Sequence, residues 1–150
     1  MHEFSVNHHR WMRQTIAVAE EALPLDVPVG AVLVKDGQIL ARACNRREID
    51  QNPIAHAEIL ALQEAARILG DWRLRDATLY VTLEPCPMCA SAIRQARVGQ
   101  LVYGAPDPVM GACGSRYGLL LDSPELPVMG GLLEAECAAL LRDFFQGIRD

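Results

Sequence analysis

The segment Thr78-Leu79-Tyr80-Val81-Thr82-Leu83-Glu84-Pro85-Cys86-Pro87-Met88-Cys89 carries the strongest structural signal in the chain. Its first half, residues 78–83, is rich in β-branched and apolar residues and predicts a buried strand. Pro87 then predicts the start of a short helix that reaches Arg97, because proline is tolerated best in the first turn of a helix. A further strand is predicted over residues 100–103. This succession of strand, helix and strand favours parallel pairing through a right-handed crossover.

Upstream of this segment, the pattern predicts a helix followed by a β-hairpin. Apolar residues recur at helical spacing over residues 8–23, with Asn7 as the predicted N-cap and Pro24 as the stop. The residues expected on the buried face of this helix are Met12, Ile16, Ala19 and Leu23. Residues 29–34 then predict a buried strand, and Asp36-Gly37 predicts the tight turn into a returning strand over residues 38–43.

The remaining segments complete an α/β pattern. Residues 56–69 and 133–148 predict two more helices, and a short fifth strand is predicted near Val128. The buried stripe of the last helix is expected to contain Leu133, Cys137, Leu140, Leu141 and Phe144. Residues 104–118 are rich in Gly and Pro and predict a loop. We therefore expect one domain over residues 1–150, with a mixed sheet of about five strands, an antiparallel hairpin at one side and helices on both faces.

Composition narrows the range of functions. The net charge is −5, whereas a purely electrostatic nucleic-acid binder is normally basic. No apolar run is long enough to span a membrane, and the first residues lack the pattern of a secretory signal. The five cysteines form an odd set in a chain without an export signal, which predicts reduced thiols and a cytoplasmic location.

Two short motifs supply the residue types of a catalytic zinc site. His56, Cys86 and Cys89 provide three ligands, and Glu58 provides a carboxylate that need not be one. The predicted helices begin at His56 and Pro87, so both ligand groups lie at helix N-termini. First-turn side chains can project past the end of a helix toward one point, and the helix dipole there favours thiolate over thiol.

Glu58 is predicted to move protons. A fourth protein ligand would close the metal site, so a free carboxylate beside an open position better fits a general acid–base role. In isolation, Cys86-x-x-Cys89 also fits half of a structural zinc site or a redox pair. Cys113 or Cys137 could complete such a structural site, although Cys137 lies on an apolar helical stripe and is better interpreted as core.

The chain resembles the bacterial tRNA-specific adenosine deaminases of the cytidine deaminase-like superfamily over nearly its whole length. His-x-Glu with Pro-Cys-x-x-Cys marks the superfamily, and other matches are more specific. The matching stretches are residues 27–34, 45–46, 55–59, 78–86, 88–90, 103–105, Asp107, 111–115, 136–137 and 143–145. The resemblance implies a three-layer α/β/α fold, a homodimer, one Zn²⁺ per subunit and no membrane attachment.

The resemblance also implies a reaction and its binding residues. Adenosine at the wobble position of a tRNA anticodon stem-loop would become inosine, with zinc-activated water attacking C6 and Glu58 carrying protons. Asn45 would hydrogen-bond the target nucleoside, and Val29 and Leu83 would line the base pocket. Backbone N–H groups near Ala57 and after Pro85 would bind the base and the tetrahedral intermediate.

Other expected contacts lie farther along the chain, where the sequence departs from the family. Asp107 would meet the nucleotides that flank the target, and Phe144-Phe145 would shape the nucleotide channel, although core packing explains that pair equally well. The loop Pro108-Val109-Met110 lacks the family's lysine, and residues 126–128 and 146–150 lack its polar and basic residues. Because phosphate contacts supply much of nucleic-acid affinity, these losses predict weaker or more salt-sensitive RNA binding, or a different substrate.

Three functions follow from these observations. The first is adenosine-to-inosine deamination on tRNA. The second is the same chemistry on a free nucleobase or nucleoside, of the guanine or cytosine type, which the acidic charge favours. The third is a catalytically idle homologue that serves as a binding subunit, which the presence of Glu58 disfavours.

Overall fold

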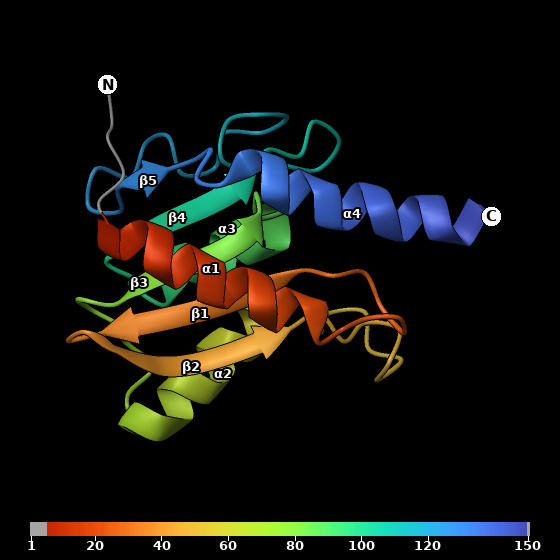
Figure 1. Cartoon of the computed structure of the whole chain (residues 1–150). Helices are drawn as coiled ribbons and strands as arrows, with labels where there is room; N and C mark the ends of the chain where they lie inside the picture. Colours follow the sequence, from red (N-terminus) through yellow and green to blue (C-terminus); the bar gives the residue numbers. More distant parts are fainter. Residues whose placement is uncertain (1–5, 150) are drawn as a thin grey trace.

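The computed structural model describes residues 6–149, which form one five-stranded sheet with helices on both faces (Figure 1). The strands are β1 (Gly30–Lys35), β2 (Gln38–Cys44), β3 (Thr78–Leu83), β4 (Gln100–Ala105) and β5 (Val128–Met129). The helices are α1 (Val6–Glu20), α2 (Ala57–Leu69), α3 (Pro87–Gln95) and α4 (Glu134–Arg149). The predicted α/β class and number of strands are confirmed.

The sheet has the order β2-β1-β3-β4-β5 and is mixed. β1 runs antiparallel to both of its neighbours, whereas β3, β4 and β5 are mutually parallel. The predicted hairpin between β1 and β2 turns at Asp36 and Gly37, whose φ angles of 52° and 74° are those that a type I′ turn requires. Because β2, β3 and β4 all run in one direction, their carboxyl ends meet at one edge of the sheet.

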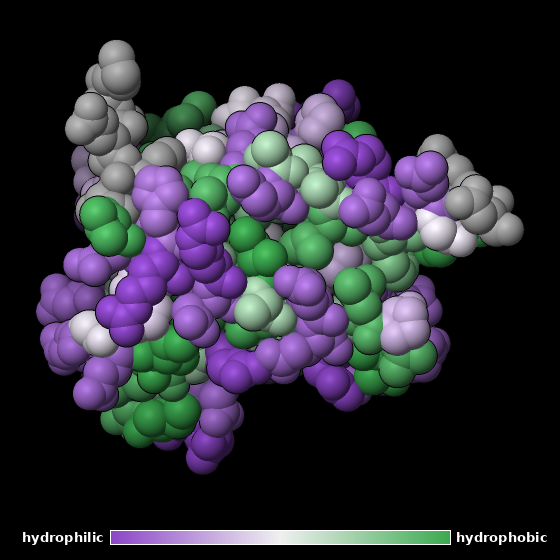
Figure 2. Space-filling view, in the orientation of Figure 1, coloured by the Kyte–Doolittle hydropathy of each residue, from purple (hydrophilic) through white to green (hydrophobic). Residues whose placement is uncertain are grey.

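Two hydrophobic cores lie on opposite faces of the sheet, because successive strand residues point to opposite sides. Leu33, Leu79 and Leu101 pack with α2 and α3, while Val32 and Val102 pack with α1 and α4. This arrangement gives three layers, helix on sheet on helix, as the family resemblance implied. Figure 2 shows mainly hydrophilic side chains on the outer surface of α1, with hydrophobic residues in the seam between α1 and α4.

The first helix differs from its prediction at both ends. It ends at Glu20 rather than Leu23, and turns carry the chain to Leu25. A proline disfavours the helical conformation of the residue that precedes it. The helix therefore ends before Pro24 is reached. Leu23, predicted to be on the buried face, is therefore 41% exposed. Asn7, predicted as the N-cap, lies inside the helix.

The last helix is less buried than its apolar stripe predicted. Only Cys137 of the five stripe residues is buried, and Leu133 lies before the helix rather than within it. The reason is that α4 covers only β4 and β3 and then extends beyond the body of the sheet (Figure 1). The strand before the predicted loop is also longer than expected, because β4 pairs with β3 as far as Ala105. Within residues 6–149, no helix is long and apolar enough to cross a lipid bilayer.

Candidate active site

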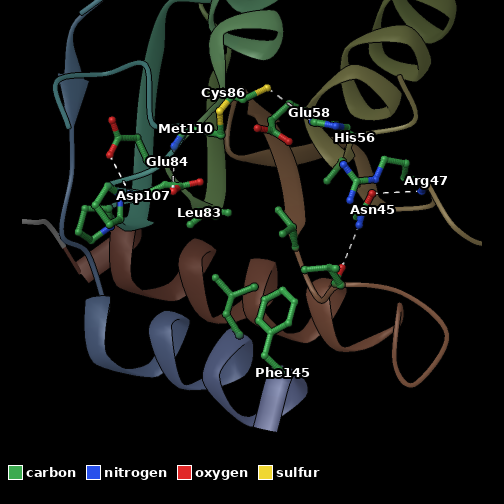
Figure 3. A pocket seen from close by; sticks show the side chains of 16 residues that line it. Asn45, Arg47, His56, Glu58, Leu83, Glu84, Cys86, Asp107, Met110 and Phe145 are labelled. Carbon is green, nitrogen blue, oxygen red and sulfur yellow. Dashed lines mark hydrogen bonds between the residues drawn. The ribbon is translucent and has the colours of Figure 1, made fainter. Parts of the chain in front are cut away.

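The starts of α2 and α3 meet at the edge of the sheet where β2, β3 and β4 end. His56 is the N-cap residue of α2, and Cys86 is the N-cap residue of α3. His56 has extended backbone angles, φ −73° and ψ 149°, so the direction of its side chain does not follow the rotation per residue of the helix. This is how His56 and Glu58, two residues apart, reach one site (Figure 3). In open α/β sheets, ligands bind beyond the carboxyl ends of the strands, where this site lies.

His56, Cys86 and Cys89 are arranged as metal ligands. Their ligand atoms all lie within 4.8 Å of one another. His56 Nδ1 is 3.6 Å from the Cys86 Sγ and 3.5 Å from the Cys89 Sγ. In a tetrahedral zinc site, with Zn–S of about 2.3 Å and Zn–N of about 2.05 Å, sulfur and nitrogen lie about 3.5 Å apart. The donor set and its spacing therefore fit one tetrahedral Zn²⁺ with a fourth position left for another ligand.

The two thiols differ in how readily they ionise. A hydrogen bond from Cys89 lowers the pKa of Cys86 to about 4, with a further contribution from His56. The same hydrogen bond, together with burial, raises the pKa of Cys89. The predicted thiolate is thus favoured at Cys86, whereas Cys89 keeps its proton as the donor to Cys86. A coordinated divalent cation would ionise the second thiol as well.

Glu58 is a buried carboxyl group beside the three candidate ligands. It is 4% exposed and lies in the first turn of α2. Burial raises the pKa of Glu58 to about 7, and the negative charge of Cys86 acts in the same direction. A carboxyl group with a pKa near neutrality can both accept and donate a proton under physiological conditions. Its environment therefore suits the general acid–base role predicted for it.

A cavity of about 480 Å³ opens beside these residues and is large enough for a nucleobase. Six of the eight predicted substrate-binding residues line it, namely Val29, Asn45, Ala57, Leu83, Asp107 and Phe145. Pro85 and Phe144 are not among the lining residues. Cys86, which carries the predicted N–H after Pro85, does line the cavity, and Phe144 packs edge-on against Phe145. Their roles in substrate binding remain predictions.

Asn45 is held by a buried carboxylate that the sequence reasoning missed. Its Nδ2 donates to Asp26 Oδ1 at 2.9 Å and to the carbonyl of Val27 at 3.2 Å, while its Oδ1 accepts from the backbone N–H of Arg47 at 3.2 Å. Both amide protons are therefore engaged. Only the second lone pair of Oδ1 is left, so we expect Asn45 to accept a hydrogen bond from a substrate hydroxyl or N–H group.

Glu84 holds the loop that follows β4 and forms one wall of the cavity. It is 2% exposed and accepts hydrogen bonds from the backbone N–H groups of Asp107, Cys113 and Ser115 and from the Ser115 hydroxyl. Burial by itself would raise the pKa of Glu84, but these hydrogen bonds hold the pKa below its ordinary value. Glu84 thus fixes Asp107, which itself accepts from the N–H groups of Val109 and Met110.

Gly111 allows this loop to close on Glu84, and Gly111→Ala tests its importance. A Cβ at Gly111 would lie 2.4 Å from the Asp107 carbonyl oxygen and 2.4 Å from the Glu84 carboxyl carbon. We expect the variant to lose about 1–3 kcal/mol of unfolding free energy, as other overpacked sites do. Urea denaturation measures this loss. The control is Gly147→Ala in α4, where an added Cβ would meet no atom within 4 Å apart from its own stretch of helix, and equal stability losses in the two variants would contradict this account.

The sequence alone assigns no role to Glu84 and Arg47, which line the cavity, or to Asp26, which supports the lining residue Asn45. Its place in the Thr82-Leu83-Glu84-Pro85-Cys86 stretch is the one sequence signal for Glu84. Asp26 contacts residues about twenty positions away, so only the fold brings its partners to it. Arg47 lines the cavity, although nothing in its local sequence distinguishes it from the chain's other arginines.

Comparisons with known proteins agree with the motif-based resemblance. The MafB19-like deaminase family matches residues 6–146. The tRNA-specific adenosine deaminase of Bacillus subtilis (strain 168) is 48% identical over 143 residues, which cover 93% of this chain and 89% of that protein. A structure from biochemical and structural studies of A-to-I editing by tRNA:A34 deaminases has a TM-score of 0.83 and 43% identity, covering 88% of this chain and 99% of that chain.

The same comparisons bear on the alternative substrate class. A guanine deaminase from Bacillus subtilis matches with a TM-score of 0.65 and 39% identity, covering 67% of this chain and 66% of that chain. The fold is therefore shared with an enzyme named for a free base. The similarity to the tRNA-specific protein is higher and extends over more of the chain.

Proposed function

The chain belongs to the MafB19-like deaminase family, and we propose that it converts adenosine to inosine at the wobble position of a tRNA anticodon. One observation carries the chemistry. Three ligand atoms with the spacing of a tetrahedral metal site lie next to a buried carboxyl group and a cavity large enough for a nucleobase. The choice of RNA over a free base is supported by the 48% identity to a tRNA-specific relative over 93% of the chain.

His56, Cys86 and Cys89 would hold one Zn²⁺ per subunit. When bound, the ion would supply an activated water molecule for attack on C6 of adenine. Glu58 accepts a proton from that water and delivers it to the adjacent ring nitrogen. The carboxylate of Glu58 would then take the second proton from the hydroxyl group added at C6 and transfer it to the exocyclic amine, so that the C6–N bond breaks and ammonia leaves. Val29 and Leu83 hold the faces of the base and exclude bulk water.

The assembly and the location of the protein are part of the same proposal. We infer a homodimer, because α4 carries exposed apolar residues beyond the sheet, with Phe145 46% and Ile148 67% exposed. A second copy that covered them would bury apolar surface next to the cavity that Phe145 lines. A cytoplasmic location agrees with a tRNA substrate and with five cysteines that form no disulfide.

The substrate class is tested by offering RNA and small molecules to the same enzyme preparation. An anticodon stem-loop with adenosine at the wobble position should yield inosine and one equivalent of ammonia. Free guanine, cytosine and adenosine should release no ammonia above a no-enzyme blank. A stem-loop with guanosine at the wobble position is the matched RNA control. Ammonia release from a free base, with no inosine in the RNA, would replace the proposed substrate with the alternative one.

A further inference from the structure

Arg47 is a cation at the rim of the cavity. Its guanidinium group points into the cavity between Asn45 and His56 (Figure 3). Among the residues of the described chain that line the cavity, Arg47 is the only arginine or lysine, whereas Glu58, Glu84 and Asp107 are acidic. A substrate group with negative charge that enters this cavity would therefore meet Arg47 first.

The guanidinium of Arg47 makes no hydrogen bond or ion pair with residues 6–149. Within residues 6–149, no carboxylate oxygen lies within 4.0 Å of it, whereas the adjacent Arg46 binds Asp50 through two hydrogen bonds of 3.0 Å. Arg46 is also absent from the cavity lining. The two neighbouring arginines thus differ in function: one is neutralised on the surface, and the other presents its five N–H donors to the cavity.

The backbone that carries Arg47 is fixed by two buried polar side chains. Asp26, 1% exposed, accepts from the N–H groups of Glu48 at 2.7 Å and Ile49 at 3.1 Å through Oδ2. Asn45, 7% exposed, accepts from the N–H of Arg47 itself. Because Asp26 also binds the Asn45 amide, one carboxylate positions both Asn45 and the loop that presents Arg47. A binding group held in place before the ligand arrives loses less entropy on binding.

We propose that Arg47 binds a backbone phosphate next to the base held in the cavity and so makes the enzyme select an RNA strand over a free nucleobase. This inference rests on the proposed function and names the group that recognises the strand. A guanidinium pairs with two phosphate oxygens at once, which suits it to this contact. The loop Pro108-Val109-Met110 offers no cation at the opposite wall, so the phosphate contact falls to Arg47.

The test compares Arg47→Ala with Arg46→Ala in a Glu58→Gln background, which allows RNA binding to be measured without turnover. We expect Arg47→Ala to weaken binding of the stem-loop by about tenfold or more, the usual effect of losing a charged hydrogen bond. The slope of log affinity against log salt should fall by about one. Arg47→Lys should restore part of the affinity, because it keeps the charge but loses the two-pronged contact. Arg46→Ala should change the affinity by less than about twofold, as exposed ion pairs contribute little.

A second arm identifies the phosphate. Two stem-loops are made, each with one uncharged methylphosphonate on one side of the wobble adenosine. For the protein with Arg47, one of these two replacements should weaken binding. For Arg47→Ala, the same replacement should cause no further loss of affinity. Equal affinity of the two arginine variants, or additive losses at every methylphosphonate, would overturn the proposal. Failure of the proposed function is recognised separately, because the enzyme with Glu58 intact would then form no inosine in the stem-loop, whatever the affinities of the two arginine variants.

Discussion

Glu58→Gln is expected to lower kcat by about 10³–10⁴-fold, at the upper end of what one general acid–base residue contributes. Glutamine keeps the size and one oxygen of the side chain but cannot accept and release a proton. Glu58 is buried and its pKa is raised to about 7, so the parent side chain can both take up and release a proton at neutral pH. Single-turnover formation of inosine in the stem-loop measures the loss, and metal analysis of the same protein measures bound zinc.

The zinc content of this variant separates two roles for Glu58. We expect one zinc per subunit, since His56, Cys86 and Cys89 already have the spacing of a three-ligand site. The matched control is Glu64→Gln, which changes a half-buried glutamate of the same helix that pairs with Arg67 and should leave both kcat and zinc content unchanged. A Glu58→Gln protein that lacks zinc would show that Glu58 is a ligand.

Cys89→Ala is expected to remove both zinc and activity. Cys89 is fully buried in the first turn of α3, so water cannot replace its sulfur without disturbing the core. A ligand present at 1,000 times its Kd contributes about 4 kcal/mol of stability, and its loss in a chain of this length lowers Tm by about 10 °C. Thermal unfolding with and without added zinc measures this difference in the variant and in the parent protein.

The control for this substitution is Cys44→Ala, at a half-buried cysteine in β2 that lies outside the metal-ligand group. It should keep the zinc, the activity and the response of Tm to a chelator. Stoichiometric zinc in Cys89→Ala, with Tm still dependent on the metal, would contradict the proposed ligand set and point to another donor.

Local sequence signals predicted most of the fold because they act over a few residues. Asp36-Gly37 specifies its own turn, and Pro87 specifies the start of α3. The errors occur where distant packing decides the outcome. The apolar stripe of α4 predicted a buried face, but α4 extends past the sheet. The sequence of a helix contains no information on where the neighbouring sheet ends.

The same distinction applies to the site. His56, Glu58, Cys86 and Cys89 could be identified because each group lies within one helix start, and their chemistry is recognisable from spacing alone. Asn45 was predicted through the family resemblance, but its contact with Asp26 could not be, because that hydrogen bond joins residues 19 positions apart. A lone buried Asp carries no sign in the sequence of what it will bind.

The most direct test of the central claim is the position of the edited nucleotide in a complete tRNA. Purified zinc-loaded enzyme is incubated with an unmodified tRNA in ¹⁸O-labelled water. The product is sequenced, and the mass of its inosine is measured by mass spectrometry. We predict that inosine forms at the wobble position only, that it carries one ¹⁸O atom, and that Glu58→Gln yields none. Inosine at several adenosines, or ammonia released with an unchanged tRNA, would contradict the claim that this chain is a wobble-specific tRNA deaminase.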